Sequence, residues 1–251
     1  MNPLTGVLGE AWRIYRAHTS HLLAIAFVFY LVAAIVVGLL DLIGIFGLFL
    51  GWIVQLFAAF LLQATLFKAV QDVRDGRADM SFGETVSSAW PFIVPVAAAS
   101  ILAGIAIAVG LVLLIVPGLI LITIWAVIVP VIVFERSGAI ASFGRSQQLV
   151  RGNGWPVFGT LVVLFIIQIV VGIVLGLIFS GLPTVLGKGL STVIAGTLVA
   201  PFIAMAVALI YYRLSGQDAP ARVPGAPGEP GWQGGPGGPG GAGWPAGPGP
   251  A

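Results

Sequence analysis

Residues 92–134, with the sequence FIVPVAAASILAGIAIAVGLVLLIVPGLILITIWAVIVPVIVF, contain no charged side chain. As one continuous helix this run would be about 65 Å long, because each helical residue adds about 1.5 Å. The hydrocarbon core of a bilayer is only about 30 Å thick. The run therefore predicts two membrane-spanning helices that fold back on each other. The turn is expected at Val116-Pro117-Gly118, because proline and glycine interrupt helices.

Two other long apolar runs lead to the same interpretation. Residues 22–67 are interrupted by Asp41 and the glycines that follow it, and the last run is interrupted by Gly181-Leu182-Pro183. Each run is long enough for two spans. The sequence therefore predicts an all-α bundle of six transmembrane helices, at about residues 21–41, 47–68, 92–115, 118–134, 156–180 and 190–212.

The composition agrees with a membrane protein and excludes several kinds of site. Hydrophobic residues make up 59% of the chain and charged residues 8%, whereas soluble domains carry about 25% charged residues. A net charge of +2 gives no support to nucleic-acid binding. The chain has no cysteine, which excludes disulfides, thiolate metal sites and cysteine nucleophiles.

The distribution of lysine and arginine predicts the orientation of the spans. Ten of the eleven basic residues lie on one side of the predicted membrane, and only Lys188 lies on the other. Because short loops rich in basic residues stay in the cytosol, we expect a protein of the cytoplasmic membrane with both termini in the cytosol. The ten residues are Arg13, Arg16, Lys68, Arg74, Arg77, Arg136, Arg145, Arg151, Arg213 and Arg222.

A short polar segment precedes each pair of spans. The three segments are VLGEAWRIYR (7–16), SFGETVSSAW (81–90) and SFGRSQQLVR (142–151), and each has a bulky apolar residue, a glycine and then a charge. The segments after the second span of each pair are also alike, at 72–76, 135–138 and 213–216. This pattern predicts three repeats of a surface amphipathic helix plus a helical hairpin. The units are about 4–76, 81–138 and 139–215, which together form a membrane domain over 1–215.

Residues 216–251 differ from the rest of the chain. Glycine and proline fill twenty-two of these thirty-six positions. A segment of this composition cannot bury an apolar core. We therefore expect a disordered, Gly/Pro-rich C-terminal tail.

The short segments are expected to lie in the headgroup plane with an apolar face towards the membrane, although plain loops are the alternative. In the third segment, Ile140, Phe143 and Val150 face one way at helical spacing, and Arg145 and Gln148 face another. In the first segment the apolar face consists of Leu4, Val7, Leu8, Ala11 and Ile14, with Glu10 and Arg13 opposite.

Few side chains inside the spans could carry chemistry. Gln55, Gln63 and Gln168 are the uncharged polar residues at depth; they could line a polar path or form interhelical hydrogen bonds. His18 and His21 share a helical face, but zinc would need at least a third ligand. We therefore expect no catalytic residue, no metal site and no cofactor.

Two arginines are the best candidates for an interaction. Arg145 and Arg151 follow the fourth predicted span on the side assigned to the cytosol, where anionic lipids accumulate. They are expected to contact lipid headgroups or an acidic protein partner. The alternative is that both arginines only set the orientation of the spans.

The stretch 129–155, VPVIVFERSGAIASFGRSQQLVRGNGW, resembles the membrane domain of the glycerophosphoryl diester phosphodiesterase membrane-domain family and its uncharacterised bacterial relatives. It departs from that family's pattern at Gln147 and at Ser142-Phe143. Residues 8–12 and 208–213 are similar to the family's opening and closing segments, so the resemblance covers roughly 4–216. In the full-length relatives a separate soluble domain performs the hydrolysis. The resemblance therefore implies a membrane domain and no catalytic residue.

These observations together predict a non-catalytic membrane protein that acts as a scaffold or binds lipids or partner proteins. A small transporter or permease subunit is the alternative, and an intramembrane enzyme ranks third because no acid–base pair is present. A transporter should have a polar cavity near the midplane, lined by Gln55, Gln63 or Gln168. A scaffold should have a sealed, apolar interior.

Overall fold

The structure is a computed structural model that describes residue 4 and residues 6–74 and 81–216, all within one compact unit, Met1–Ala221. Every regular element among these residues is a helix. Apart from Gly216, the segment predicted to be a disordered tail lies outside the described residues. The elements are α1 (Val7–Ala17), α2 (Thr19–Asp41), α3 (Ile45–Arg74), α4 (Phe82–Ala89), η1 (Trp90–Phe92), α5 (Ile93–Leu113), α6 (Ile115–Ile124), α7 (Ile128–Glu135), α8 (Ala139–Val150), α9 (Gly154–Ile178) and α10 (Thr184–Leu214).

Six helical segments are long and apolar enough to cross a membrane, as predicted. Their most apolar stretches have mean hydropathies of 2.3 to 3.2. The segments are Thr19–Leu40, Ile45–Arg74, Phe82–Leu113, Ile115–Glu135, Gly154–Ile178 and Leu186–Leu214.

Two predicted boundaries differ from the structure. The turn between the third and fourth spans is at Leu114, whose backbone is extended, and Pro117 lies in the first turn of α6. Proline is tolerated there because the N–H groups of a first helical turn have no partner within the helix. In addition, α10 begins at Thr184, so Lys188 lies in its first turns and not in a loop before the span.

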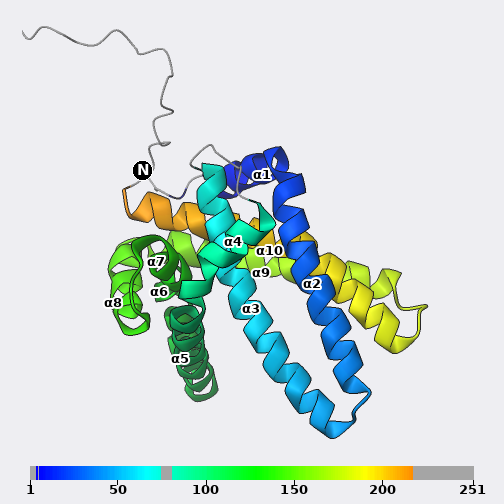
Figure 1. The fold of residues 1–251 in the computed structure, drawn as a ribbon. Helices are drawn as coiled ribbons and strands as arrows, with labels where there is room; N and C mark the ends of the chain where they lie inside the picture. The colour runs from blue at the N-terminus through cyan, green and yellow to red at the C-terminus, as the bar shows by residue number, and fades with distance from the viewer. Residues whose placement is uncertain (1–3, 5, 75–80, 217–251) are drawn as a thin grey trace, which may run out of the picture. The chain divides into compact units, whose positions relative to one another are not determined.

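The helices pack in a cyclic order (Figure 1). Within each hairpin, α2 packs on α3, α5 on α6, and α9 on α10. The first helix of each hairpin also packs against the second span of another: α5 on α3, α9 on α6, and α2 on α10. The short helices follow the same order, with α4 on α3, α8 on α7 and α1 on α10. The second spans meet one another through contacts among α3, α7 and α10.

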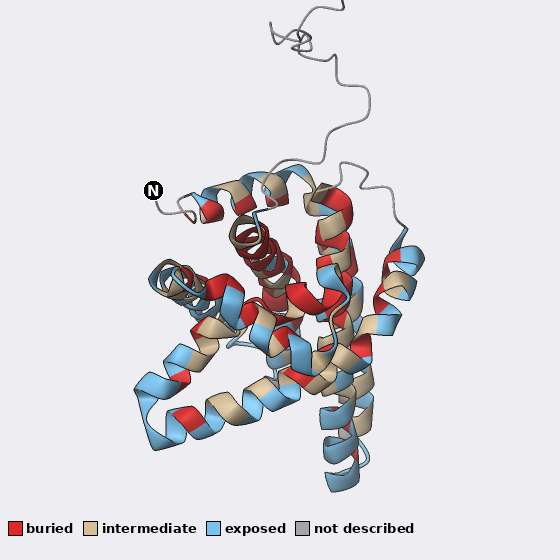
Figure 2. Cartoon of the chain, turned by 90° about the vertical axis from the view of Figure 1, so that its left-hand side faces the viewer, coloured by how far each residue is buried: buried red, intermediate tan, exposed pale blue. Residues whose placement is uncertain are grey.

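Burial is concentrated where the hairpins meet. In the most apolar window of the sixth span, 72% of the residues are buried, against 6–39% in the other five spans. In α3 most of the buried residues lie in the C-terminal half, between Leu62 and Val73. The far ends of the hairpins are pale blue in Figure 2, and Leu42, Ile45 and Val112 are 82–86% exposed. Lipid chains are the solvent that accepts such a surface.

The fourth span is interrupted near its middle. Helix α6 ends at Ile124 and α7 begins at Ile128, with a turn at residues 125–127. Pro130 explains the break, because it has no N–H to donate to the carbonyl of Ala126 and its ring collides with that carbonyl. Pro201 lies within the continuous helix α10, and Pro95 is in the first turn of α5. Of these three prolines, only Pro130 interrupts a span.

Candidate functional site

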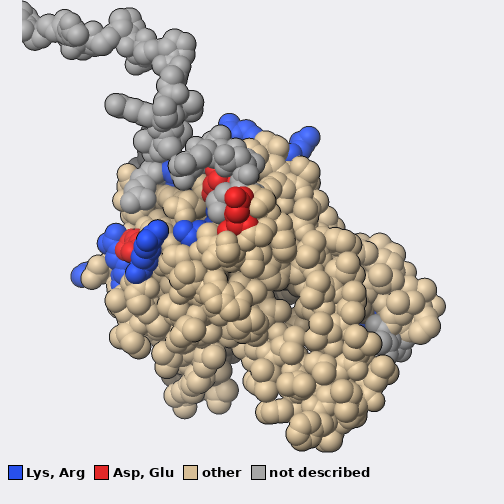
Figure 3. Space-filling view, in the orientation of Figure 1, with Lys and Arg blue, Asp and Glu red and all other residues tan. Residues whose placement is uncertain are grey.

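Charged residues gather at one end of the described unit. Figure 3 shows the Lys, Arg, Asp and Glu atoms at the upper end, while the lower part of that face is uncharged. Helices α1, α4 and α8 lie at or near this end (Figure 1). The candidate contact residues of α8 therefore belong to this charged end.

Helix α8 is held there by a hydrogen bond from Ser146. Ser142 and Ser146 are fully buried, and the Ser146 hydroxyl donates a 2.8 Å hydrogen bond to the carbonyl of Ile124 at the end of α6. Trp125, in the break, meets Phe143 edge-on at 4.9 Å. The break in the fourth span thus supplies the carbonyl on which α8 docks.

The residues of the predicted apolar face of α8 differ in how far the bundle covers them. Ile140 is 74% exposed on the protein surface, Phe143 is half-buried and Val150 is buried. The residues of α8 that are buried are Ser142, Ser146, Leu149 and Val150. Hydrogen bonding at the helix break orients α8, and a hydrophobic pattern cannot predict that contribution. In α1, Leu4, Val7 and Ala11 are buried within the protein.

Replacing Ser146 by alanine should destabilise the protein by about 1–2 kcal/mol, because it leaves the buried carbonyl of Ile124 without a donor. Ser142 is the matched control: it is equally buried, but its hydroxyl donates within its own helix, to Ala139. Its replacement by alanine should cost less than about 0.5 kcal/mol. Equal losses in the free energy of unfolding in detergent would show that the Ser146 bond does not anchor α8.

Glu135 joins three helices at the charged end. Arg145 Nε on α8 lies 3.0 Å from both carboxylate oxygens of Glu135, at the end of α7. The Tyr211 hydroxyl on α10 donates to the same carboxylate at 2.9 Å. Glu135 therefore connects the fourth span, the α8 helix and the sixth span.

A second ion pair joins a span to a short helix, as the Glu135–Arg145 pair does, but with the positive and negative side chains exchanged. Arg213, near the end of α10, pairs with Glu10 of α1. Both pairs connect the end of a second span to the residue after the glycine in a short helix, Glu10 after Gly9 and Arg145 after Gly144. In one pair the span supplies the cation, and in the other it supplies the carboxylate.

Helix α1 has a further bond to α10, which parallels the docking of α8. The Tyr15 hydroxyl donates to the carbonyl of Leu198 at 3.0 Å, three residues before Pro201. Burial raises the pKa of Tyr15, so the hydroxyl stays a donor across the physiological range. Both α1 and α8 therefore bind through a hydroxyl to the backbone of a span that contains a proline.

The two predicted contact arginines differ in their surroundings. Arg145 is held by Glu135, whereas Arg151 is exposed and has no ion-pair or hydrogen-bond partner among the described residues. Arg136 is also exposed and lacks such a partner in this part of the chain. It was not predicted as a contact residue, although it directly follows the last residue of the fourth span. Arg136 and Arg151 flank the two ends of α8.

The structure does not bring the three predicted glutamines together. Gln55 and Gln63 are exposed on α3, and Gln168 is exposed on α9. Helices α3 and α9 do not pack extensively against each other in the described chain. Nor does any group of three potential metal ligands occur among the described residues; His18 Nδ1 instead lies 3.3 Å from the carbonyl of Ile14.

Comparisons with protein-family models, with curated proteins and with solved structures found no match to this chain.

Proposed function

We propose that the protein is a non-catalytic, multi-pass protein of the cytoplasmic membrane that binds anionic lipid headgroups through Arg136 and Arg151. The supporting observation is that both guanidinium groups are exposed at the ends of α8 without a carboxylate partner among the described residues, while Arg145 between them is paired. A basic residue near an anionic membrane surface gains about 1 kcal/mol of attraction. The charged end faces the cytosol, and so do both termini.

The ion pair of Arg145 has a positioning role in this proposal. Arg145 and Glu135 fix α8 to the fourth span, and Ser146 fixes it at the helix break. With its backbone held in this way, α8 carries the two flanking arginines at fixed positions beyond its two ends. An acidic protein partner would bind the same two groups.

The proposed architecture is a threefold repeat of a short helix plus a hairpin. Its support is the cyclic packing of α4 on α3, α8 on α7 and α1 on α10. The two ion pairs of opposite polarity lie at corresponding positions of this arrangement. In the remaining unit Glu84 instead completes a capping box with Ser81. The resemblance to the glycerophosphoryl diester phosphodiesterase membrane-domain family stays a prediction.

Removing both exposed guanidinium groups should lower lipid retention. The Arg136→Gln/Arg151→Gln protein, purified in mild detergent, should keep about one-thirtieth as much phosphatidylglycerol at limiting lipid, since two contacts of about 1 kcal/mol are lost. Bound lipid is counted by native mass spectrometry. Two results would refute the proposal. One is lipid retention equal to that of the parent protein, and the other is lipid retention that is restored only when an acidic protein is present.

The control is Arg145→Gln, which removes one charge from the same end of the molecule but a guanidinium that Glu135 already holds. It should reduce retention less than Arg151→Gln alone. Equal reductions would mean that net charge, rather than contact, retains the lipid. Orientation is checked in each variant with a single cysteine introduced at Leu182, which a membrane-impermeant maleimide should modify from outside intact cells.

The transporter alternative receives no support from the positions of the glutamines. It requires a shared polar cavity near the midplane, and Gln168 lies on a different helix from Gln55 and Gln63, with all three exposed.

A further inference from the structure

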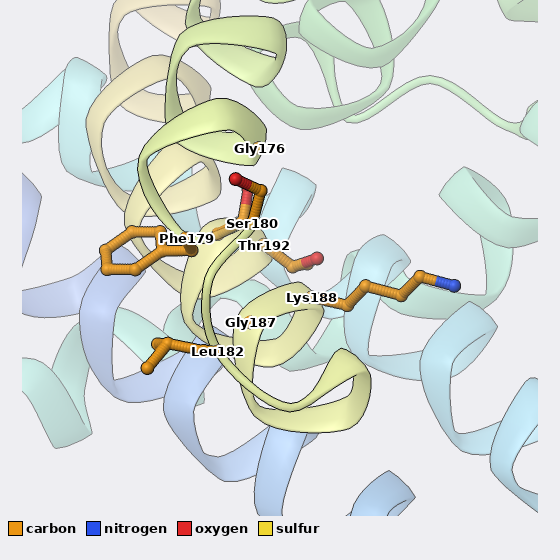
Figure 4. Close-up of a pocket in the computed structure, with 8 residues that line it drawn as sticks. Gly176, Phe179, Ser180, Leu182, Gly187, Lys188 and Thr192 are labelled. Atoms are coloured by element: carbon orange, nitrogen blue, oxygen red, sulfur yellow. The ribbon is translucent and has the colours of Figure 1, made fainter.

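A cavity of about 470 Å³ lies where α9 turns into α10 (Figure 4). Its lining includes the polar side chains Ser180, Lys188, Ser191 and Thr192. Phe179 and Leu182 contribute apolar surface. In Figure 4 these two side chains extend to one side of the connection, whereas Lys188 and Thr192 extend to the other. The cavity thus has an apolar side and a cationic, hydroxyl-bearing side.

Three donor groups on α10 point to an anionic ligand. Ser191 and Thr192 follow Lys188 by three and four residues, which places the three side chains on one face of the helix. No carboxylate pairs with Lys188 in the described part of the chain. One ammonium group and two hydroxyls therefore line the same cavity.

The two hydroxyls differ from those of three threonines in the spans. Thr65, Thr123 and Thr160 each donate to the carbonyl four residues earlier, at 2.7–2.9 Å. Ser191 and Thr192 make no hydrogen bond of this kind, or any other side-chain hydrogen bond, within the described residues. Their protons remain available to a ligand. An oxyanion with several acceptor oxygens, such as a phosphate, can accept from both hydroxyls and from the ammonium group.

The cavity also lies far from the arginines at the charged end. Lys188 and Arg213 are both on α10, and twenty-five residues of helix separate them by about 37 Å. The hydrocarbon core is about 30 Å thick. Along α10 the cavity therefore lies farther from the charged end than the hydrocarbon core is thick.

We propose that this cavity binds the phosphate group of a lipid headgroup at the outer membrane surface, through Lys188, Ser191 and Thr192. Phe179 and Leu182 would contact the apolar part of the same lipid, which favours a lipid over free phosphate. Ser180 donates to Leu177 at 2.7 Å, so its oxygen remains an acceptor for a hydroxyl-bearing headgroup such as phosphoglycerol. The site is independent of the contact proposed for Arg136 and Arg151.

A cysteine reporter can test the site in the full chain, which has no native cysteine. In the Leu182→Cys protein, short-chain phosphatidylglycerol should slow modification by a water-soluble maleimide, whereas diacylglycerol of the same chain length should not. Adding Lys188→Gln should raise the half-protecting lipid concentration about tenfold, through loss of one charge-assisted contact. Thr192→Val should raise it about fivefold.

Two substitutions serve as controls. Lys188→Arg keeps the cation and should retain protection to within about threefold. Thr160→Val removes a hydroxyl that is already bonded within α9, and should change nothing. A second reporter cysteine, in place of the exposed Ile140 on α8, measures how lipid changes maleimide modification through general effects on the micelle.

A trial with inorganic phosphate shows whether the cavity binds a lipid phosphate or the free anion. Protection by phosphatidylglycerol but not by inorganic phosphate supports a lipid site, and equal protection by both would support a site for the free anion. Protection by diacylglycerol to the same extent, or protection that survives Lys188→Gln unchanged, would overturn the proposal. Lys188 would then be an interfacial lysine whose charge only reaches water.

Discussion

Replacing Gly196 by leucine should unfold or severely loosen the membrane domain, with a loss of about 3 kcal/mol in the free energy of unfolding. Gly196 is buried on α10, and a Cβ atom added there would overlap the ring of Tyr30 on α2. Because α10 is the most buried span, a larger side chain at this contact separates α2 from the centre of the bundle. The measurement is unfolding by a denaturing detergent, followed by helical circular dichroism.

Gly104 provides the matched control for this substitution. It lies within α5, and a Cβ atom added there has no heavy atom within 4 Å among the described residues. Gly104→Leu should raise stability by up to about 1 kcal/mol, because leucine favours helix over glycine. Adding Tyr30→Ala to Gly196→Leu should recover part of the loss, since it vacates the space that the ring fills. Equal stabilities of the two glycine variants would contradict the assigned contact.

Reversing the charge of Glu135 is expected to have the second-largest effect. Glu135→Arg places two guanidinium groups together and removes the acceptor of the Tyr211 hydroxyl. The expected loss is about 2 kcal/mol, which allows for screening by solvent because the Arg145 side chain is 42% exposed. Detergent-induced unfolding measures this loss as well.

The double reversal Glu135→Arg/Arg145→Glu should recover at least half of that loss. The protein already uses the reversed polarity at the corresponding position, where the span carries Arg213 and the short helix carries Glu10. Arg136→Glu is the control, because it reverses an exposed charge next to Glu135 and should change stability by less than about 0.5 kcal/mol. A double variant as unstable as Glu135→Arg would show that the two pairs are not interchangeable.

The six spans were predictable because their physical cause is visible in the sequence. A charge-free run longer than the bilayer is thick must turn, and each such run does so in the structure. The position of the turn was less predictable. Pro117 was expected to break the helix, but a proline fits equally well in a first turn, and the chain turns at Leu114.

The candidate site was predictable only in part. Arg151 is exposed, as a contact residue must be. Arg145 instead pairs with the carboxylate of Glu135, ten residues earlier. That pairing depends on how α7 and α8 pack. The docking of α8 on the fourth span was not predictable. Ser146 donates to the carbonyl of Ile124 at the helix break, and no hydrophobic periodicity records such a bond.

The contact between α1 and α10 constrains the order in which the protein can mature. Helix α1 binds α10, which is made after all the other described helices, through Tyr15 and Glu10. Until α10 has been inserted, α1 lacks its main partner, α2 lacks one of its two large contacts, and the most buried span of the bundle is missing. The ring of helices is therefore complete only after α10 has packed against α1 and α2. Before that step, the Tyr15 hydroxyl and the Glu10 carboxylate lack their partners on α10.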